Sequence, residues 1–418
     1  MNNQHALAQG DSKLLSDITV LDLTRVVSGP FATMQLGDLG AQIVKIEEPE
    51  HGDDSRAFGP PFIGGESAYF LSVNRNKKSV AIDLKTPAGK ELLLKLVESA
   101  DVLVENFRPG TMARLGLEEA NLKVRNPNLI YCSITGFGTS GPDAQRPGYD
   151  LILQGESGIM DITGDPDGQP TKVGTSVGDM IAGLYATQAI LAALYKRKSG
   201  GAARSVHVSM LDSLASLLTF NAGIYYATGD SPTRRGNEHP TICPYETFQV
   251  SDGWLNLGVA NDKFWHLFCQ VTGAQTLEAD PRFKSAPLRV TNRKELRPLV
   301  TELLTSNTRA HWMSALGRAG IPCGEIKTIQ EVCEAPQLKS RGMVIHMEHP
   351  TAGTVMNIDS PIRVDDKNAA DDAPPPLLGQ HTRTVLEHLA GISQSDLDVL
   401  ESEGVIRVSK HHANDQGT

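Results

Sequence analysis

Short β-branched runs alternate with apolar, helix-like segments through the first 200 residues of the chain. The runs with strand character are 18–23, 42–46, 79–83, 102–105, 129–133 and 205–209. Helical character lies between many of them, in 31–39, 86–99, 111–115 and 178–197. Strands that alternate with helices in this way indicate a mostly parallel, doubly wound sheet. We therefore predict an α/β fold with a doubly wound large domain.

The pattern changes near residue 229. Segment 230–240 is rich in Pro, Arg, Gly and Asn, which is typical of a linker or an active-site loop. Beyond it we predict a hairpin over 247–259 and helices at 263–272, 293–304 and 310–319, which together form a smaller α+β domain. The predicted division is a large domain over 1–228, a small domain over 229–335, and a return to the large domain over 336–418. That last part contains an exposed linker at 365–376, a final helix at 382–389 and a polar tail after 410.

Composition and charge narrow the class of protein. The 418 residues include 39 Lys+Arg and 49 Asp+Glu, a formal charge of −10, so general nucleic-acid binding is not expected. The first fifteen residues lack the apolar core of a secretory signal. The apolar stretch 180–195 is short for a membrane span and reads as a buried helix. We expect a soluble, cytoplasmic protein without a membrane partner.

Cysteine and histidine usage argues against a structural metal or a disulfide framework. The five cysteines are scattered, odd in number and never at CxxC spacing, which favours a reducing compartment. His411 and His412 are adjacent on a polar tail and have no third ligand nearby in sequence. No metal site is predicted.

Two glycine motifs offer competing chemistries. Gly136–Gly141 matches GxGxxG after a predicted strand, but Pro142-Asp143 follows directly and no helix opens for a pyrophosphate. Gly174–Gly178 matches GxSxG before a helix, as in a hydrolase elbow, but a turn rather than a strong strand precedes it. Neither a nicotinamide or flavin site nor a serine hydrolase is favoured.

A third candidate is Asp179, at the start of the long apolar helix. A carboxylate in the first turn of a helix is stabilised by the macrodipole and by free amide groups, and this structural role is common. The alternative is a nucleophilic carboxylate that forms a covalent acyl intermediate. In that role we expect the side chain to stay ionised at neutral pH, with neighbouring amides stabilising a developing oxyanion.

An ordered series of blocks resembles the class III CoA-transferases, the family of formyl-CoA transferase and carnitine CoA-transferase. The resemblance covers nearly all of 14–389. Its blocks are Val20-Leu-Asp-Leu23 with Gly29-Pro30, Leu39-Gly-Ala41 with Val44-Lys-Ile-Glu47, Asn74-Arg-Asn-Lys-Lys-Ser79 with Asp83-Leu-Lys85, Glu105-Asn-Phe-Arg-Pro-Gly110 with Arg114-Leu-Gly116, Gly136-Phe-Gly138, Gly178-Asp179 and Gly320-Ile-Pro-Cys-Gly324. It implies a Rossmann-like large domain, a small α+β domain and an interlocked homodimer.

The resemblance places the family's nucleophile on Asp179. The implied cycle runs through an acyl-aspartyl anhydride, an aspartyl-CoA thioester and a second anhydride. It needs no permanently bound cofactor, because coenzyme A and its acyl thioesters are the substrates. The implied CoA contacts are Val27, Ser28, Ile82, Asp83, Leu84, Lys85, Asn106, Phe107, Arg108, Arg114, Ile134, Thr135, Gly136 and Phe137. Arginines suit phosphates, and the phenylalanines offer apolar faces to adenine or pantetheine.

Departures from formyl-CoA transferase argue against formyl or oxalate specificity. Val27 replaces a glutamine, Glu48 replaces a basic residue, Phe137 lacks an aromatic hydroxyl, and the glycine-run loop is absent. In its place, Arg235, His239 and Tyr245 offer donors for the distal carboxylate of a substrate. We therefore expect a dicarboxylate acceptor and succinyl-CoA as donor. The alternative for these residues is a solvent-exposed linker.

Two alternative functions are considered: a racemase, which shares this fold, and a non-enzymatic protein, which shares the CoA ligand. The α-methylacyl-CoA racemases use a His upstream of the aspartate, and here the stretch is Gly148-Tyr149-Asp150, which disfavours proton transfer at the α carbon. A non-enzymatic CoA-binding protein would bind CoA without exchanging acids. The sequence thus predicts an enzyme, a CoA-transferase, with the racemase as its alternative.

Overall fold

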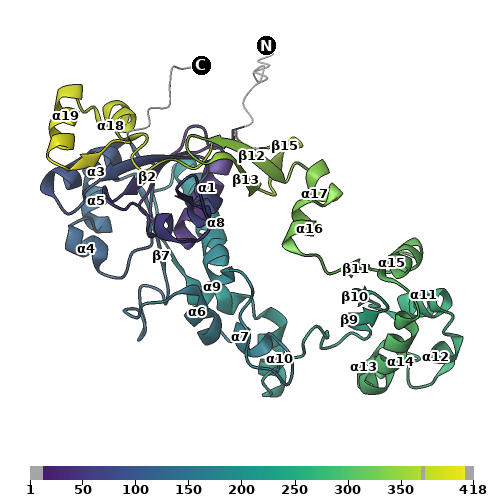
Figure 1. Cartoon of the computed structure of the whole chain (residues 1–418). Helices are drawn as coiled ribbons and strands as arrows, with labels where there is room; N and C mark the ends of the chain where they lie inside the picture. The colour runs from purple at the N-terminus through teal and green to yellow at the C-terminus, as the bar shows by residue number, and fades with distance from the viewer. Residues whose placement is uncertain (1–12, 369–371, 410–418) are drawn as a thin grey trace, which may run out of the picture. The chain divides into compact units, whose positions relative to one another are not determined.

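The computed structural model describes residues 13–368 and 372–409 (Figure 1). It divides into a larger unit, made of 13–159, 173–220 and 339–409, and a smaller unit, made of 160–172 and 221–338. The chain passes between the units after residues 220 and 338, and the short segment 160–172 belongs to the smaller unit. Both units contain helices and strands, and the larger one carries the parallel sheet.

The central sheet of the described chain has seven strands in the order β16-β5-β2-β1-β6-β7-β8. Neighbouring strands pair in parallel, except that β16 runs antiparallel to β5. Numbered among the parallel strands alone, the order is 3-2-1-4-5-6, the Rossmann order. The strands are β1 Thr19–Asp22, β2 Gln42–Glu47, β5 Lys77–Ile82, β6 Val102–Glu105, β7 Ile130–Thr135, β8 Val206–Ser209 and β16 Ile406–Arg407.

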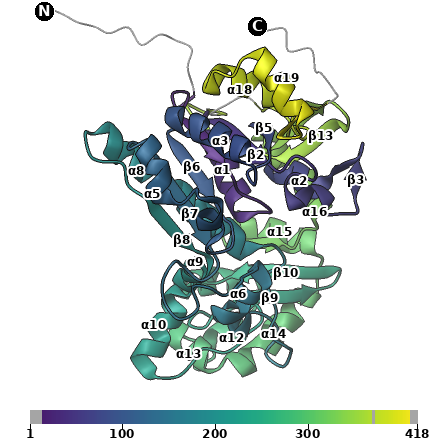
Figure 2. The ribbon, with the colours of Figure 1, turned by 90° about the vertical axis from the view of Figure 1, so that its left-hand side faces the viewer.

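Helices cover both faces of this sheet because both of its faces are apolar (Figure 1, Figure 2). One core cluster joins one face of the strands to α3 Pro87–Ser99, α4 Thr111–Leu115, α5 Glu119–Arg125, α18 Thr382–Ala390 and α19 Gln394–Ser402. The other joins the opposite face to α1 Ser28–Asp38, α6 Asp150–Glu156, α8 Val177–Lys198 and α9 Met210–Ser216. The predicted doubly wound arrangement is therefore present.

Smaller elements complete the larger unit. They are η1 Asp54–Ala57, β3 Phe62–Ile63, β4 Glu66–Ser67, α2 Ala68–Val73, β12 Val344–His349, β13 Gly353–Ile358, β14 Arg363–Val364 and β15 Lys367–Asn368. Leu71 of α2 packs on Ile345, Met347 and Val355 of the β12–β13 hairpin. This small cluster packs α2, in the segment that follows β2, against the β12–β13 hairpin in the C-terminal part of the larger unit.

The smaller unit has its own core, which includes Trp265, Phe268 and Trp312. Its sheet has the order β11-β10-β9, with antiparallel pairing, so the predicted hairpin is confirmed. Its elements are β9 Tyr245–Val250, β10 Gly253–Gly258, β11 Cys323–Glu325, α11 Asp262–Thr272, α12 Gln275–Ala279, α13 Ala286–Thr291, α14 Arg293–Thr305, α15 Arg309–Arg318 and α16 Ile329–Cys333. Short helices at the passages between the units are α7 Ile159–Ile162, α10 Thr219–Thr228 and α17 Pro336–Ser340.

Three expectations for the C-terminal part were wrong or lie outside the described residues. The helix at 382–390 is not the last, because α19 and the edge strand β16 follow it. The end of the expected exposed linker is buried at Pro375 and Pro376, and the Arg56 guanidinium donates to the Pro376 carbonyl at 3.1 Å. Residues 369–371 of that linker, and the tail with its two histidines, fall outside the described chain.

Helix α8 is longer than the apolar stretch from which it was predicted. Within the described residues it is the one helix that is long and apolar enough to cross a membrane by length and composition. Its buried face includes Ala182, Ala186 and Ile190, which belong to the core cluster shared with α1 and the sheet. This packing is that of a core helix.

Candidate active site

The loop that follows β1 is held at the point where the strand order of the sheet reverses. Helices α1 and α3 lie on opposite faces of the sheet, and β1 and β6 are neighbours, so their carboxyl ends form the crevice in which ligands of such sheets bind. Asn106, directly after β6, spans this crevice. Its Oδ1 accepts from the N–H of Arg25 at 2.9 Å, and its Nδ2 donates to the Arg25 carbonyl at 2.8 Å and to Ser28 Oγ at 3.3 Å.

The Asp179 carboxylate lies against the start of α1. The Ser28 hydroxyl and the Ser28 backbone N–H both act on this carboxylate as donors that favour its ionised form. The approach of the two helices depends on Gly183, one turn after Asp179, because a Cβ there would lie 2.8 Å from the Ser28 carbonyl oxygen. Asp179 is thus placed at the first turn of its own helix and at the first turn of α1.

The pKa of the Asp179 carboxyl is raised to about 7, first by burial and then by the charge of Asp150, against the lowering effect of the two bonds from Ser28. The sequence-based expectation of a fully ionised side chain at neutral pH is therefore corrected. The helix terminus and its amides favour the anion, but a half-buried site beside a second carboxylate opposes them. At neutral pH both protonation states of Asp179 are populated.

Asp150 anchors the turn that leads into Asp179. Its Oδ1 accepts from the Gly178 N–H at 2.8 Å, and its Oδ2 accepts from Gln154 Nε2 at 2.7 Å. Gln154 is fully buried, and its Oε1 accepts from the Val173 N–H at 2.8 Å. Helix α6 therefore fixes both the start and the end of the segment before the candidate nucleophile.

Tyr69 of α2 is the third titratable side chain of this site. The pKa of its hydroxyl is raised by burial and by the charges of Asp179 and Asp150, against a lowering effect of the Ser176 side chain. The ring is held edge-on by Phe58, with centroids 5.4 Å apart. A phenol this close to two carboxylates stays protonated and can donate a hydrogen bond to a reacting oxygen.

The predicted CoA contacts lie along the carboxyl edge of the sheet but differ in accessibility. Val27, Ser28, Ile82, Ile134 and Phe137 are buried. Lys85, Arg108 and Arg114 are exposed, and Asp83, Leu84, Asn106, Phe107, Thr135 and Gly136 are intermediate. Lys85 follows β5, and Arg108 and Arg114 follow β6, so exposed positive charges lie at the edge where the phosphates of CoA are expected to bind.

Two of these residues have contacts that limit the role expected from the sequence. The amide of Asn106 is engaged with the backbone of Arg25, so it holds the loop in place. The guanidinium of Arg146 lies over the ring of buried Phe137, 4.4 Å from its centroid. Phe107 is the more accessible ring, and Arg25 lies over it at 5.5 Å.

The predicted substrate residues belong to the smaller unit and are divided between two pockets. Arg235 lines a pocket of about 820 Å³ with Arg293 and Arg297, whereas Tyr245 lines another of about 450 Å³. The His239 ring packs edge-on against Tyr245, with centroids 5.2 Å apart. The structure therefore groups His239 with Tyr245 and separates Arg235 from that pocket.

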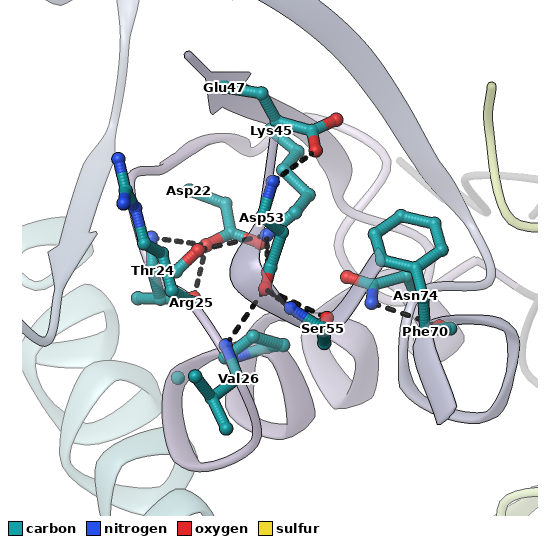
Figure 3. Close-up of polar contacts among 12 residues, drawn as sticks. Asp22, Thr24, Arg25, Val26, Lys45, Glu47, Asp53, Ser55, Phe70 and Asn74 are labelled. Carbon is teal, nitrogen blue, oxygen red and sulfur yellow. Dashed lines mark hydrogen bonds and ion pairs between the residues drawn. The ribbon is translucent and has the colours of Figure 1, made fainter. Parts of the chain in front are cut away.

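Sequence reasoning missed an ionic cluster under the loop after β1. Lys45 and Asp53 form an ion pair at 2.8 Å with fully buried side chains (Figure 3). Lys77 and Asp22 form another at 3.0 Å, which is also fully buried. Burial alone would raise the pKa of Asp22, but the charges of Lys77 and Lys45 lower it to about 2. Lys45 and Lys77 lie in sequence blocks that resemble the family, so the sequence could have drawn attention to them. Asp53 lies outside those blocks.

No cluster of metal-ligating side chains occurs among residues 13–368 and 372–409. The cysteines are free, and Cys132, Cys243 and Cys269 are buried.

Comparisons with known proteins agree with one another. The model of CoA-transferase family III matches residues 15–382. A mouse succinyl-CoA:glutarate CoA-transferase is 39% identical, over 94% of this chain and 90% of its own length. An acetyl-CoA:oxalate CoA-transferase of Acetobacter aceti is 41% identical, over 85% and 91%. The crystal structure of a CAIB/BAIF family protein from Brucella suis superimposes with a TM-score of 0.82 at 40% identity and covers 91% of this chain and all of that one.

Proposed function

Because this chain belongs to CoA-transferase family III, we propose that it moves CoA from succinyl-CoA to a free dicarboxylic acid, with Asp179 as nucleophile. The observation that carries the proposal is the Asp179 carboxylate, held by two donors from Ser28 at the carboxyl edge of a Rossmann-ordered sheet. The chain is an enzyme, and its substrates are acyl-CoA thioesters and carboxylic acids.

The reaction begins when an Asp179 oxygen attacks the thioester carbonyl of the donor. The C–S bond breaks, CoA thiolate leaves, and an acyl-aspartyl anhydride remains. The thiolate then attacks the Asp179 carbonyl carbon, releases succinate and forms an aspartyl-CoA thioester. The acceptor carboxylate attacks that thioester, which expels the thiolate and gives a second anhydride. Attack of the thiolate on the acceptor acyl carbon restores the Asp179 carboxylate.

The residues around Asp179 have distinct parts in these steps. Only the ionised carboxylate attacks, and the two bonds from Ser28 favour that form. When Asp179 becomes an acyl group its negative charge is lost, so repulsion from Asp150 is relieved in the anhydride and the thioester. The Tyr69 hydroxyl is placed to donate to a developing oxyanion.

The acceptor class is inferred from relatives and from the smaller unit. Succinyl-CoA and glutarate appear in the name of a relative that spans nearly the whole chain. Arg235 or His239 would hold the distal carboxylate, as the donors expected from the sequence. Oxalate belongs in any acid panel, because a similarly close relative is named for it. The names of these relatives favour transfer over racemisation.

We further propose a homodimer in the cytoplasm. The outer face of α8 presents Leu184, Tyr185 and Tyr195, with exposed fractions of 44%, 40% and 77%. Apolar side chains along one exposed helix face are typical of a surface that a second copy covers. Sedimentation as a monomer at micromolar concentration would contradict the dimer.

The activity is tested by following CoA transfer from succinyl-CoA to glutarate, oxalate, mesaconate, formate and propionate by chromatography. We expect faster transfer to the longer dicarboxylates, and loss of all transfer in Asp179→Ala. Equal rates with monocarboxylates and dicarboxylates would overturn the substrate class. Proton exchange at the α carbon into deuterated water without transfer would overturn the reaction type.

A further inference from the structure

The loop between β1 and α1 contains a residue in a conformation that its side chain disfavours. Val26 has φ of +69°, in the left-handed region, where a β-branched side chain is a genuine outlier. Such conformations persist only where the surroundings hold them, and they cluster at functional sites. Val26 lies two residues before Ser28, whose hydroxyl and N–H act on the Asp179 carboxylate where α1 and α8 approach closely at Gly183.

The contact that holds Val26 comes from Asp53. The N–H of Val26 donates to Asp53 Oδ1 at 3.1 Å, and the same oxygen accepts from the N–H of Ser55 at 2.9 Å and from its Oγ at 2.7 Å (Figure 3). Asp53 is 1% exposed, so this bond is made in an interior where an unpaired amide would be costly. A polar side chain after β2 thus fixes the backbone of the loop after β1.

Lys45 holds Asp53 in turn. Its Nζ lies 2.8 Å from Asp53 Oδ2 and donates to the Thr24 carbonyl at 2.8 Å, so one cation binds the carboxylate and the loop together. The opposite charges keep the pKa of Asp53 well below its usual range, and the group stays ionised while Asp179 titrates. The ion pair between Lys45 and Asp53 therefore persists over the pH range in which Asp179 changes its charge.

Contacts on both sides of Val26 fix the backbone of the rest of the loop. Asn106 pairs with both the N–H and the carbonyl of Arg25. A Cβ at Gly29 would lie 2.2 Å from the Thr24 Cβ, so the loop closes tightly onto the start of α1. With Thr24, Arg25 and Gly29 fixed, the conformation of Val26 sets the direction of the Ser28 N–H and hydroxyl.

We propose that Asp53 is a positioning residue for Asp179: it holds Val26 in the left-handed conformation, and thereby aims both Ser28 donors at the Asp179 carboxylate. This inference rests on the proposed function for its kinetic consequence, but the link from Asp53 to Asp179 is a property of the folded chain. Asp53 itself touches no reacting atom. Its loss weakens two bonds that favour ionised Asp179, so the pKa of Asp179 rises.

The test measures the pH dependence of kcat/KM for succinyl-CoA:glutarate transfer, whose acidic limb reports the ionisation of Asp179 in the free enzyme. The other titratable groups that interact with Asp179 are Asp150 on α6 and Tyr69 on α2, and both are retained. We expect Asp53→Ala to move the acidic limb upward by about one pH unit, with a larger fall in kcat than rise in KM. Asp53→Asn, which keeps an acceptor oxygen for Val26, should move it less.

A matched control separates positioning from the loss of a buried ion pair. Asp38 is 6% exposed, and its Oδ1 accepts from Arg75 Nε at 2.9 Å, but neither side chain contacts the loop after β1 in the described contacts. Asp38→Ala therefore loses a comparable pair and should leave the acidic limb in place. Equal shifts in Asp38→Ala and Asp53→Ala would overturn the proposal.

Glycine at position 26 provides a rescue, because glycine adopts positive φ without steric cost. We expect the Asp53→Ala/Val26→Gly double variant to bring the acidic limb back toward that of the native enzyme. If Asp53→Ala does not fold, as judged by circular dichroism, Val26→Pro leaves the ionic cluster intact. Proline has no N–H and a φ near −65°, so this single substitution should move the acidic limb of kcat/KM to higher pH. An unmoved limb in Val26→Pro would overturn the proposal.

A second readout needs no turnover. The difference in unfolding free energy between each variant and its Asp179→Asn derivative, measured at several pH values, gives the pKa of Asp179 in that variant. If Asp179→Asn retains CoA transfer, the proposed function fails, and this readout still tests the role of Asp53. An Asp179 pKa that is the same with and without Asp53 would overturn the inference alone.

Discussion

The N–H of Gly178 donates to Oδ1 of Asp150 at 2.8 Å, so the residue before Asp179 is tied to a second carboxylate. The same contact that shapes the turn brings a negative charge beside the nucleophile, and that charge helps to raise the pKa of Asp179. Structure and reactivity are therefore coupled at Asp150: the turn needs the oxygen as an acceptor, whereas the pKa of Asp179 responds to the charge.

Asp150→Asn should separate these two effects. The amide oxygen of asparagine still accepts from Gly178, but the negative charge is gone, so the pKa of Asp179 falls. We expect the acidic limb of kcat/KM to move to lower pH by about 0.5–1 unit. Glu156→Gln, at the other end of α6, removes an equal charge that pairs with Arg146 and should leave the limb in place. A limb that moves upward in Asp150→Asn would contradict the account.

Asp179→Asn should stabilise the fold above neutral pH. Because the folded-state pKa is raised from 3.8 to about 7, the folded protein binds more protons than the unfolded one in that interval. The native aspartate therefore loses stability as pH rises from about 4 to about 7, and asparagine does not. The gain from the substitution should grow between pH 4 and pH 8 by on the order of 4 kcal/mol, measured by denaturant unfolding. An equal difference at both pH values would show that the carboxyl titrates normally.

Gly183→Ala should separate Asp179 from its donors. The new methyl group would meet the Ser28 carbonyl oxygen at 2.8 Å, so α1 and α8 must move apart. We expect a loss of about 1–3 kcal/mol in unfolding free energy and a lower kcat. Gly223→Ala, in α10, is the matched control because nothing lies within 4 Å of the added Cβ. Native kcat in a folded Gly183→Ala variant would argue against the Ser28–Asp179 contact.

Arg108→Ala and Arg114→Ala should raise the KM for succinyl-CoA with little change in kcat. Both side chains are exposed after β6, where we place the phosphates of CoA. The loss of one phosphate contact should cost about tenfold in KM. Arg125→Ala removes an exposed arginine that pairs with Glu91 and Glu98 and serves as the control. If all three variants bind succinyl-CoA alike, the phosphates lie elsewhere.

The sequence predicted the fold well because its strands and helices have strong, regular patterns. Runs such as Val102-Leu-Val104 are apolar throughout, as strands covered on both faces must be, and helices α3 and α8 are long enough to show their period. Strand β16 has only two residues, Ile406 and Arg407, which is too short for any pattern. Helix α19 was missed although Ser393 is a favourable N-cap that accepts from the Asp396 N–H.

The sequence pointed to Asp179 as the candidate nucleophile but not to the residues that surround it in the structure. Asp179 stood in a block that resembled a family, whereas Asp150, Tyr69 and Asp53 act through contacts between residues far apart in the chain. Burial decides the pKa of Asp179 and whether Asn106 faces a ligand or a loop, and no spacing in the sequence reports it. A positive φ at Val26 is equally invisible, because β-branched residues such as valine rarely adopt it.

The most direct test of the central claim is mass spectrometry of the peptide that contains Asp179, after incubation with succinyl-CoA and trapping with hydroxylamine. We expect a hydroxamate at Asp179 that requires the thioester and is absent from Asp179→Ala and from enzyme given free CoA. Active enzyme that transfers CoA to glutarate while Asp179 remains unmodified under rapid quench would contradict the covalent route.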